Sequence, residues 1–516
     1  MPFTENQLSR ASLASLRPRA SGSFSVPEES TFGLPERVLQ FGTGVLLRGL
    51  PDFFVDQANR QGVFNGRVVV VKSTDAGSAD AFGEQNGLYT LCQRGLDQGE
   101  PKEEFVVCSA ISRVLSARAQ WPEVLRCAHN PDLRVVISIT TEVGIQLTED
   151  RVSRTSATIP PDSFPGKLTA WLYERFRAFG GSKASGLVVI PCELVVDNGT
   201  KLKEIVRELA RQNGLGSAFV DWLDEHNFFC NSLVDRIVTG MPEPTAANGI
   251  YERLGYRDDL LTVSETYRLW AIEGDEQVRE VLSFAQTDEG VIVLPDIQPY
   301  RERKLRLLNG THTLMVGLGF LSGLDTVGAC MQDASMNHFV AALMEEIIPS
   351  VPLERSITES FAREVKDRFS NPYIVHPLLN ITVQYTSKMR MRNVPTLLNY
   401  YEAFNAVPPH LTLGFAAYLL FMRAVKEENG KYFGERNGQL YPIQDDSAAY
   451  FYEQWRTSDK STRSLVADIT ANQARWGTDL NALPGFSEAV ANQLDVMMKD
   501  GAKSALELLL ESKMKT

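Results

Sequence analysis

Lys304, Asn309 and His312 bring acid–base and hydrogen-bonding groups together within nine residues. On an α-helix at ~100° per residue, Asn309 lies ~140° and His312 ~80° around the axis from Lys304, so the three share one broad side. Leu305 and Leu308 fall on that side as well, which predicts partial burial. A buried lysine can act as a general acid or base, and asparagine and histidine donate hydrogen bonds to an oxygen that gains negative charge. The stretch therefore predicts a proton-transfer site; an exposed lysine, a capping asparagine and a packed histidine are the alternative.

Gly42 and Gly44 form a second motif with a chemical use. They follow a short apolar segment that ends at Phe41, and they precede a helix-like run. The first glycine permits a tight turn, the second lets the backbone approach a pyrophosphate, and the helix N-terminus adds a partial positive charge. The third glycine of the usual pattern is displaced, because Leu47 stands there and the next glycine is Gly49. We predict that Phe41, Gly42 and Gly44 contact a dinucleotide; a turn without a ligand is the alternative.

The type of dinucleotide depends on the end of the next predicted strand. That strand, 67–71, runs into Lys72, Ser73 and Asp75. An acidic residue at this place holds the ribose hydroxyls of NAD, and Asp75 is the candidate. Lys72 with Ser73 would equally hold the additional phosphate of NADP. We therefore predict NAD as the cofactor and leave NADP open.

Alternating strands and helices are predicted to position the glycine turn. Near-continuous valine and isoleucine runs occur at 67–71, 134–139 and 186–190, with helical patterns between them. Such runs are typical of strands covered on both faces, as in the parallel sheets of α/β domains. From about Leu305 onward, apolar residues recur at helical spacing instead.

The predicted fold is therefore α/β plus all-α. An N-terminal Rossmann-type dinucleotide-binding domain is followed by a mostly helical C-terminal domain, and Pro295 and Pro299 punctuate the change. We place an N-terminal arm at 1–34, the Rossmann-type NAD-binding domain at 35–290 and the helical substrate-binding domain at 291–516.

Composition excludes several other classes of protein. The chain of 516 residues is 43% hydrophobic and 22% charged, which is typical of a soluble globular protein and not of a disordered or collagen-like chain. Its 52 basic and 64 acidic residues give a net charge of −12, which disfavours nucleic acid as a partner. No run approaches the ~18–20 apolar residues of a membrane helix. Six scattered cysteines without a CxxC pair predict free thiols in a cytoplasmic protein.

These motifs together resemble those of the polyol-specific long-chain dehydrogenases, the mannitol dehydrogenase family. The family signature is a lysine, an asparagine five residues later and a histidine three beyond that, and Lys304, Asn309 and His312 match it position by position. Further matching segments follow in the family's order at 38–42, 140–145, 191–194, 231–240, 270–274 and 368–372. The resemblance runs from about Pro35 to the C-terminus, and the most similar branch is that of the uronate reductases.

The resemblance implies a Rossmann-type NAD domain, a helical substrate domain and a site in the cleft between them, without a metal. Lys304 would protonate the carbonyl oxygen as hydride arrives from the nicotinamide, and in the reverse direction it would take the hydroxyl proton. Asn309 and His312 would polarise and position that oxygen. Thr141, in a matched segment, joins the residues expected to bind the cofactor.

The resemblance also indicates substrate-side residues. Asp235 lies in a stretch that lines the family's substrate pocket, so it is a candidate acceptor for a hydroxyl; a salt bridge with Arg236 or a role in a turn is the alternative. Lys388 resembles a substrate-side lysine of the family. Mannitol-oxidising members carry an asparagine where Leu194 stands here, and we expect Asn198, with the nearby Glu193, to serve instead.

A uronate needs a cationic partner for its carboxylate, which arginine or lysine supplies best. Lys388, Arg390 and Arg392 form the densest basic cluster beside the matched region. We expect one of them to hold the carboxylate, although a solvated basic turn is the alternative.

The expected reaction is the interconversion of a keto-uronate and an aldonate, with tagaturonate and altronate as the favoured pair. The epimeric fructuronate, another polyol and a non-catalytic NAD-binding sensor remain open. The expected partner is a small-molecule sugar acid, with no nucleic acid and no membrane, and the oligomeric state is left open.

Overall fold

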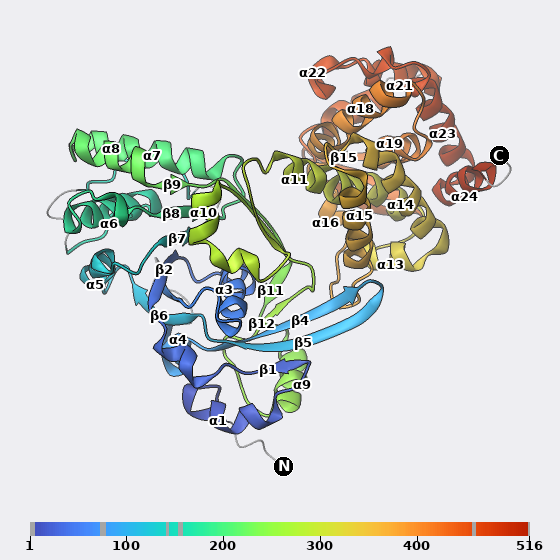
Figure 1. Ribbon diagram of the computed structural model, residues 1–516. Coiled ribbons are helices and arrows are strands. Elements are labelled where there is room, and N and C mark those ends of the chain that lie inside the picture. Colours follow the sequence, from blue (N-terminus) through green and yellow to red (C-terminus); the bar gives the residue numbers. More distant parts are fainter. Residues whose placement is uncertain (1–5, 73–78, 141–143, 153–157, 457–460, 514–516) are drawn as a thin grey trace. The chain divides into compact units, whose positions relative to one another are not determined.

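The structure is a computed structural model that describes residues 6–72, 79–140, 144–152, 158–456 and 461–513. The chain divides into two compact units (Figure 1). The first comprises Met1–Arg94 and Pro101–Ile297, and the second comprises Gly95–Glu100 and Gln298–Thr516. This division falls after Ile297 rather than at the expected 290/291 boundary, because β14 (Val291–Leu294) pairs in parallel with β13 (Leu269–Glu273) of the first unit.

A six-stranded sheet, in which every neighbouring pair is parallel, forms the centre of the first unit. Its strand order is β6-β3-β2-β7-β8-β9. In chain order these are β2 (Glu36–Phe41), β3 (Arg67–Lys72), β6 (Ile111–Ser116), β7 (Val135–Ser138), β8 (Val188–Pro191) and β9 (Phe228–Phe229). Numbered along the chain, the order reads 3-2-1-4-5-6, which is that of a doubly wound dinucleotide-binding sheet. The order reverses between β2 and β7, which makes their carboxyl ends the topological switch point.

The valine run of β3 is buried on both faces, as the sequence predicts. Val68 and Val70 belong to one hydrophobic cluster with Phe54 of α3 (Pro51–Arg60). Val69 and Val71 belong to the opposite cluster, which includes residues of α6 (Phe164–Ala178). Successive side chains of a strand point to opposite faces, so a strand covered by helices on both sides must be apolar throughout.

Two further sheets complete the first unit within the described residues. A five-stranded sheet has the order β1 (Phe24–Ser25), β5 (Glu100–Cys108), β4 (Tyr89–Asp97), β12 (Thr262–Ser264) and β11 (Val238–Gly240). A three-stranded sheet joins β10 (Ser232–Asp235), β13 and β14. The other helices of this unit are α1 (Leu13–Leu16), α2 (Val45–Gly49), α4 (Ala79–Glu84), α5 (Trp121–Arg126), α7 (Asn198–Gln212), α8 (Ser217–His226), α9 (Pro244–Leu254) and α10 (Glu276–Val281).

The described part of the N-terminal arm is docked onto the first unit. Leu8, Leu13 and Leu16 are buried in one cluster with Leu254 and Tyr256. The arm residues 6–34 therefore contribute to the core of this unit.

The second unit is mostly helical, as the sequence predicts. It contains α11 (Gln298–Arg303), η8 (Lys304–Gly310), α12 (Thr311–Leu321), α13 (Val327–Gln332), α14 (Ala334–Ile347), α15 (Arg355–Phe369), α16 (Leu378–Ile381), α17 (Tyr385–Lys388), η10 (Met389–Asn393), α18 (Val394–Phe404), α19 (Pro409–Phe421), α20 (Ala448–Arg456), α21 (Thr462–Thr470), α22 (Gln473–Trp476), α23 (Phe486–Asp500) and α24 (Ala502–Lys513). A small antiparallel sheet is formed by β15 (Lys426–Glu428), β16 (Lys431–Arg436) and β17 (Gln439–Ile443).

Two apolar helices, α12 and α19, pack against each other in the core of the second unit. Gly414 permits their close approach, because a Cβ atom there would lie 2.9 Å from the Leu314 side chain. Within the described residues, no helix combines the length and the apolar character needed to cross a membrane.

Candidate active site

The glycine turn stands at the switch point of the six-stranded sheet. Gly42 has φ +121°, and a Cβ atom there would lie 2.8 Å from the carbonyl oxygen of Ile139, just beyond β7. Its amide donates to the carbonyl of Val71 at 3.0 Å. Gly44, at the start of α2, has φ −61°, and its nearest contact for a Cβ atom is 3.9 Å away. The turn therefore requires glycine at position 42, whereas Gly44 leaves the backbone open to an approaching group.

Buried polar side chains form hydrogen bonds with the backbone carbonyls of this turn. The Gln40 amide Nε2 donates to the Gly42 carbonyl at 3.4 Å and to the Asp52 carboxyl at 3.3 Å. Arg48 donates to the carbonyl of Thr43 at 2.9 Å. Asp52 is fully buried, and this burial raises its pKa to about 7. The turn is thus held by a polar network whose protonation state changes near neutral pH.

Glu193 joins the ends of β7 and β8. Its carboxylate accepts from the Thr140 amide at 3.0 Å and hydroxyl at 3.1 Å, and from the Ser138 hydroxyl at 3.2 Å. Burial raises the pKa of Glu193, and these hydrogen bonds oppose that shift. Both oxygens are therefore used within the protein, at the edge of the sheet where the cofactor is predicted.

Asn198 ties the start of α7 to two strands. Its amide nitrogen donates to the carbonyls of Pro191 at 2.9 Å and Glu193 at 3.1 Å. Its oxygen accepts from the amides of Gly199 and Ser232, both at 2.9 Å. The side chain is fully buried. The structure therefore gives Asn198 a backbone-holding role, in contrast to the predicted contact with substrate.

Asp235 is the buried last residue of β10. The neighbouring Arg236 donates hydrogen bonds to the carbonyl of Gly49, to the Gln93 side chain at 2.5 Å and to the carbonyl of Glu265 at 2.9 Å. Burial lowers the pKa of Arg236 to about 9. The hydrogen bonds of Arg236 thus hold the surrounding loops of the first unit.

The stretch that carries Lys304 and Asn309 is a π-helix, η8, rather than the α-helix assumed from the sequence. A π-helix bonds residue i to residue i+5, so Asn309 stands about one turn along from Lys304. The wider turn brings these two residues closer to one face than an α-helix would. A regular α-helix, α12, resumes at Thr311 and carries His312. Single π turns inside helices are frequent at functional sites.

A second π-helix, η10, packs against η8. Arg306 links them, donating to the carbonyls of Met391 at 3.0 Å and Arg392 at 2.9 Å. Gly310 permits the contact, because a Cβ atom there would lie 2.9 Å from the Asn393 side-chain oxygen. The predicted basic cluster is thereby held against the predicted proton-transfer stretch.

His312 is half-buried and packs against two aromatic rings. Its ring lies parallel to Phe369, with centroids 4.0 Å apart and an interplanar angle of 9°. The ring of His376 meets it edge-on at 5.3 Å and 89°. Its Nε2 atom is sealed from solvent and has no hydrogen-bond partner among the described residues. A buried polar atom of this kind is available to a ligand.

Burial is the largest cause of the low pKa of His312, which lies well below its usual range. Repulsion from His376 when that ring is protonated, and from the cationic Arg368, Arg392 and Lys388, lowers that pKa further. The imidazole is therefore neutral at physiological pH and stands among cationic side chains.

The three members of the predicted basic cluster differ in their surroundings. Lys388 donates to the carbonyl of Ile381 at 2.8 Å, and burial lowers its pKa. Arg392 is half-buried and donates to the Thr313 hydroxyl at 3.1 Å. Arg390 is exposed.

The predicted residues thus fall into two sets. Lys304, Asn309, His312 and Lys388 belong to the second unit, where the two π-helices bring their segments together. Phe41, Gly42, Gly44, Asn198 and Asp235 belong to the first unit. Asp75 and Thr141 lie outside the described residues. No role for Phe369 or His376 follows from the sequence, because only tertiary packing brings their rings to His312.

No group of three or more His, Cys, Asp or Glu side chains suited to a metal occurs within the described ranges. All six cysteines are buried and free, as predicted.

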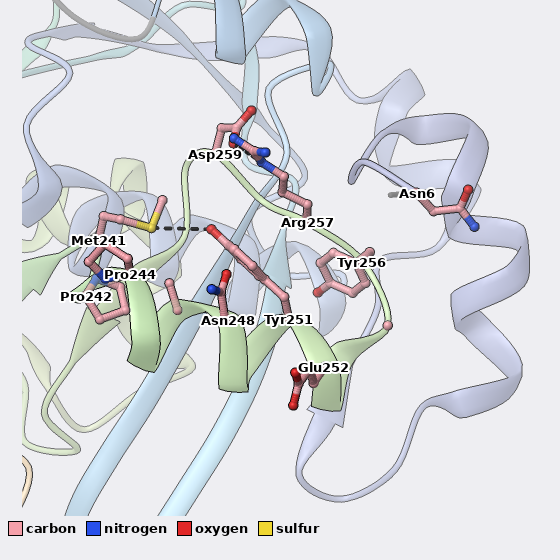
Figure 2. Close-up of a pocket in the computed structure, with 12 residues that line it drawn as sticks. Asn6, Met241, Pro242, Pro244, Asn248, Tyr251, Glu252, Tyr256, Arg257 and Asp259 are labelled. Carbon is pink, nitrogen blue, oxygen red and sulfur yellow. Dashed lines mark hydrogen bonds and ion pairs between the residues drawn. The ribbon is translucent and has the colours of Figure 1, made fainter. Parts of the chain in front are cut away.

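A cavity of about 540 Å³ opens beside α9, apart from the predicted site residues. Figure 2 shows Tyr251 reaching toward Met241 there, and the hydroxyl lies 3.5 Å from the sulfur. The same hydroxyl donates to the carbonyl of Asp258 at 2.9 Å. None of the predicted catalytic, cofactor or substrate residues lines this cavity.

Comparison with known proteins covers nearly the whole chain. The mannitol dehydrogenase Rossmann domain model matches residues 36–284, and the mannitol dehydrogenase C-terminal domain model matches residues 296–498. The altronate oxidoreductase of Shigella flexneri is 40% identical over 483 residues, which are 92% of this chain and 97% of the relative. The altronate oxidoreductase of Escherichia coli O1:K1 / APEC has the same identity and coverage.

Two solved structures share the fold. Substrate-free D-sorbitol dehydrogenase has a TM-score of 0.76 at 20% identity, covering 97% of this chain and 100% of that chain. Mannitol 2-dehydrogenase of Pseudomonas fluorescens, solved as a ternary complex with NAD and D-mannitol, has a TM-score of 0.64 at 23% identity, with coverages of 98% and 99%.

Proposed function

This chain belongs to the mannitol dehydrogenase family, and we propose that it is an NAD-dependent oxidoreductase that interconverts tagaturonate, a keto-uronate, with altronate, an aldonate. Its 40% identity to altronate oxidoreductases supports this choice of substrate. The observation that carries the proposal is the neutral His312 ring, with a sealed and unpartnered nitrogen, among cationic side chains of the second unit.

The positive charge around His312 favours a sugar acid over a neutral polyol as the substrate. A sugar acid has a permanent negative charge at neutral pH, and a polyol has none. Burial is the first cause of the low pKa of His312, and nearby cations are the second. Arg368, Arg392 and Lys388 create a positive potential at this ring. Because the imidazole itself stays neutral, it can hydrogen-bond to a substrate oxygen without competing for the carboxylate.

The glycine turn fits a dinucleotide. Gly42 makes the tight turn that no larger residue allows, and Gly44 leaves a bare Cα at the start of α2. Backbone N–H groups at such a place hold a pyrophosphate. Bound NADH would supply the hydride. Phe41, Asp75 and Thr141 keep their predicted roles at the cofactor in this proposal.

Lys304 is proposed to be the proton donor. As hydride adds to the carbonyl carbon, the C=O electrons move to the oxygen, which takes a proton from the Lys304 ammonium group. Asn309 and His312 donate hydrogen bonds to that oxygen and stabilise its developing charge. In the oxidation direction, Lys304 takes the hydroxyl proton. Asp235 accepts a hydrogen bond from a substrate hydroxyl, and Lys388 lies on the substrate side.

The test is the near-ultraviolet absorbance of NADH, followed with the purified protein and each of three ketoses: tagaturonate, fructuronate and uncharged fructose. We expect the highest kcat/KM with tagaturonate. A preference for fructuronate would assign the epimeric activity, and a preference for fructose would refute an acid substrate. Cofactor binding without turnover of any of the three would indicate a sensor. The same assay with NADPH tests the choice of NAD.

A further inference from the structure

Arg392 has an unusual environment for an arginine. It is half-buried, yet no carboxylate pairs with it among the described residues. A guanidinium has five N–H donors, and within the described ranges this one forms a single hydrogen bond, to the Thr313 hydroxyl at 3.1 Å. Fully buried charges are almost always paired, and even partial removal of a charge from water without a partner costs free energy. The remaining donors of Arg392 are therefore available to an anion.

Its position connects it directly to the predicted proton-transfer stretch. Thr313, which accepts from Arg392, follows His312 in α12 and donates to the carbonyl of Asn309 at 2.7 Å. The backbone carbonyl of Arg392 accepts from Arg306 of η8 at 2.9 Å. The guanidinium is thus held one hydrogen bond away from the turn that carries Asn309 and His312.

The neighbouring cations are less suited to a buried carboxylate. Lys388 donates to the carbonyl of Ile381 and faces Asp445. Arg306 pairs with Glu302 at 2.7 Å and bonds two carbonyls of η10. Arg390 is exposed to solvent, where an ion pair contributes little.

We propose that Arg392 is the residue that holds the substrate carboxylate, through two parallel N–H···O bonds, and so selects acids over neutral polyols. This inference rests on the proposed function and deepens it. Paired N–H donors in a fixed fork match the two oxygens of a carboxylate, which a lysine ammonium cannot do. A polyol offers no such group and gains nothing from this side chain.

The experiment compares the full-length Arg392→Gln and Arg392→Lys variants with Arg390→Gln, a control on the same π-helix. Steady-state kinetics with tagaturonate and NADH give kcat and KM. Binding of altronate and of altritol, its uncharged analogue, is measured on the NADH-loaded enzyme. Circular dichroism melting checks the fold.

We expect Arg392→Gln to raise the KM for tagaturonate roughly 10- to 100-fold with a smaller change in kcat. It should also abolish the preference for altronate over altritol, while Arg392→Lys loses part of that preference and Arg390→Gln keeps it. A purely structural role for Arg392 would instead weaken both ligands equally.

An unchanged KM and an unchanged preference in a folded Arg392 variant would overturn this inference while leaving the proposed function in place. If Arg392→Gln does not fold, Arg392→Lys decides, because it keeps the charge and loses the fork. Failure of the wild-type enzyme to reduce any keto-uronate would refute the proposed function itself, and with it this role of Arg392.

Discussion

At the scale of single residues, His312 shows how packing selects a protonation state. The parallel Phe369 ring covers one face, and His376 meets it edge-on. Removal from water disfavours the charged imidazolium, and nearby cations disfavour it further. A neutral ring can donate to a carbonyl oxygen through one nitrogen without adding charge to the proposed site, which by that proposal also admits an anion.

Lys304 is the residue whose loss should affect turnover most. We expect Lys304→Ala to lower kcat by roughly 10²- to 10⁴-fold, because a general acid is removed while the cofactor site in the first unit is untouched. Lys304→Arg should lose as much, since a guanidinium keeps its charge and does not release its proton. NADH oxidation with tagaturonate gives kcat, and NADH fluorescence titration gives cofactor affinity. Near-normal turnover in Lys304→Arg would argue for a role of charge alone.

At the scale of elements, the two π-helices decide how the second-unit side chains meet. The turn η8 places Asn309 about one turn from Lys304, and Arg306 links this turn to η10. An α-helix over the same residues would separate the lysine and the asparagine around its axis. Two distant segments thus supply one set of side chains.

The glycine turn allows a paired test of its two glycines. Gly42→Ala should lower the free energy of unfolding by more than ~1 kcal/mol, because φ is +121° and the new Cβ would lie 2.8 Å from the Ile139 carbonyl oxygen. Gly44→Ala fits the backbone and should melt like the wild type, yet bind NADH more weakly because the methyl group obstructs the pyrophosphate. Thermal melts and NADH titrations distinguish the two. Equal melting of both variants would contradict the strain at position 42.

Asp52 of α3, which accepts a hydrogen bond from Gln40 of β2, should make the free energy of unfolding depend on pH. Burial raises the pKa of Asp52 from 3.8 to about 7, so the folded state favours the protonated acid. Its contribution to stability is full below about pH 4 and is lost as pH rises through about 7. Asp52→Asn, which mimics the protonated form, should therefore gain up to about 4 kcal/mol relative to wild type between pH 4 and pH 8. Denaturant unfolding across this range measures the difference; parallel curves would contradict the shift.

At the scale of the whole molecule, the net charge opposes the binding of the proposed ligands. The chain carries a net charge of −12, which alone would repel an anionic substrate and a dinucleotide. In the proposed function, attraction therefore comes from local groups: the backbone N–H groups of the glycine turn in the first unit and the cations around His312 in the second. Specificity for an acid depends on these short-range contacts, because salt screens longer-range ones beyond ~10 Å.

Much of the fold could be predicted from local patterns. The valine run of β3 indicated a strand buried on both faces, and the structure places its alternate residues in two clusters. Gly42 indicated a tight turn, and its positive φ confirms that turn. These features depend on a residue's own backbone preferences and on the periodicity of its immediate neighbours, so they can be read along the chain.

Other features depended on partners distant in sequence. The π turn of η8, the backbone contacts that occupy Asn198 and the ring stack on His312 each involve segments that meet only after folding. The spacing of Lys304, Asn309 and His312, by contrast, is a property of the sequence alone, and it was enough to indicate the family. Only the tertiary structure decided that Arg392 has no acid partner among the described residues and that Asn198 is already hydrogen-bonded to backbone. The reason is that the hydrogen-bond partners of a buried polar group are set by the segments that pack around it.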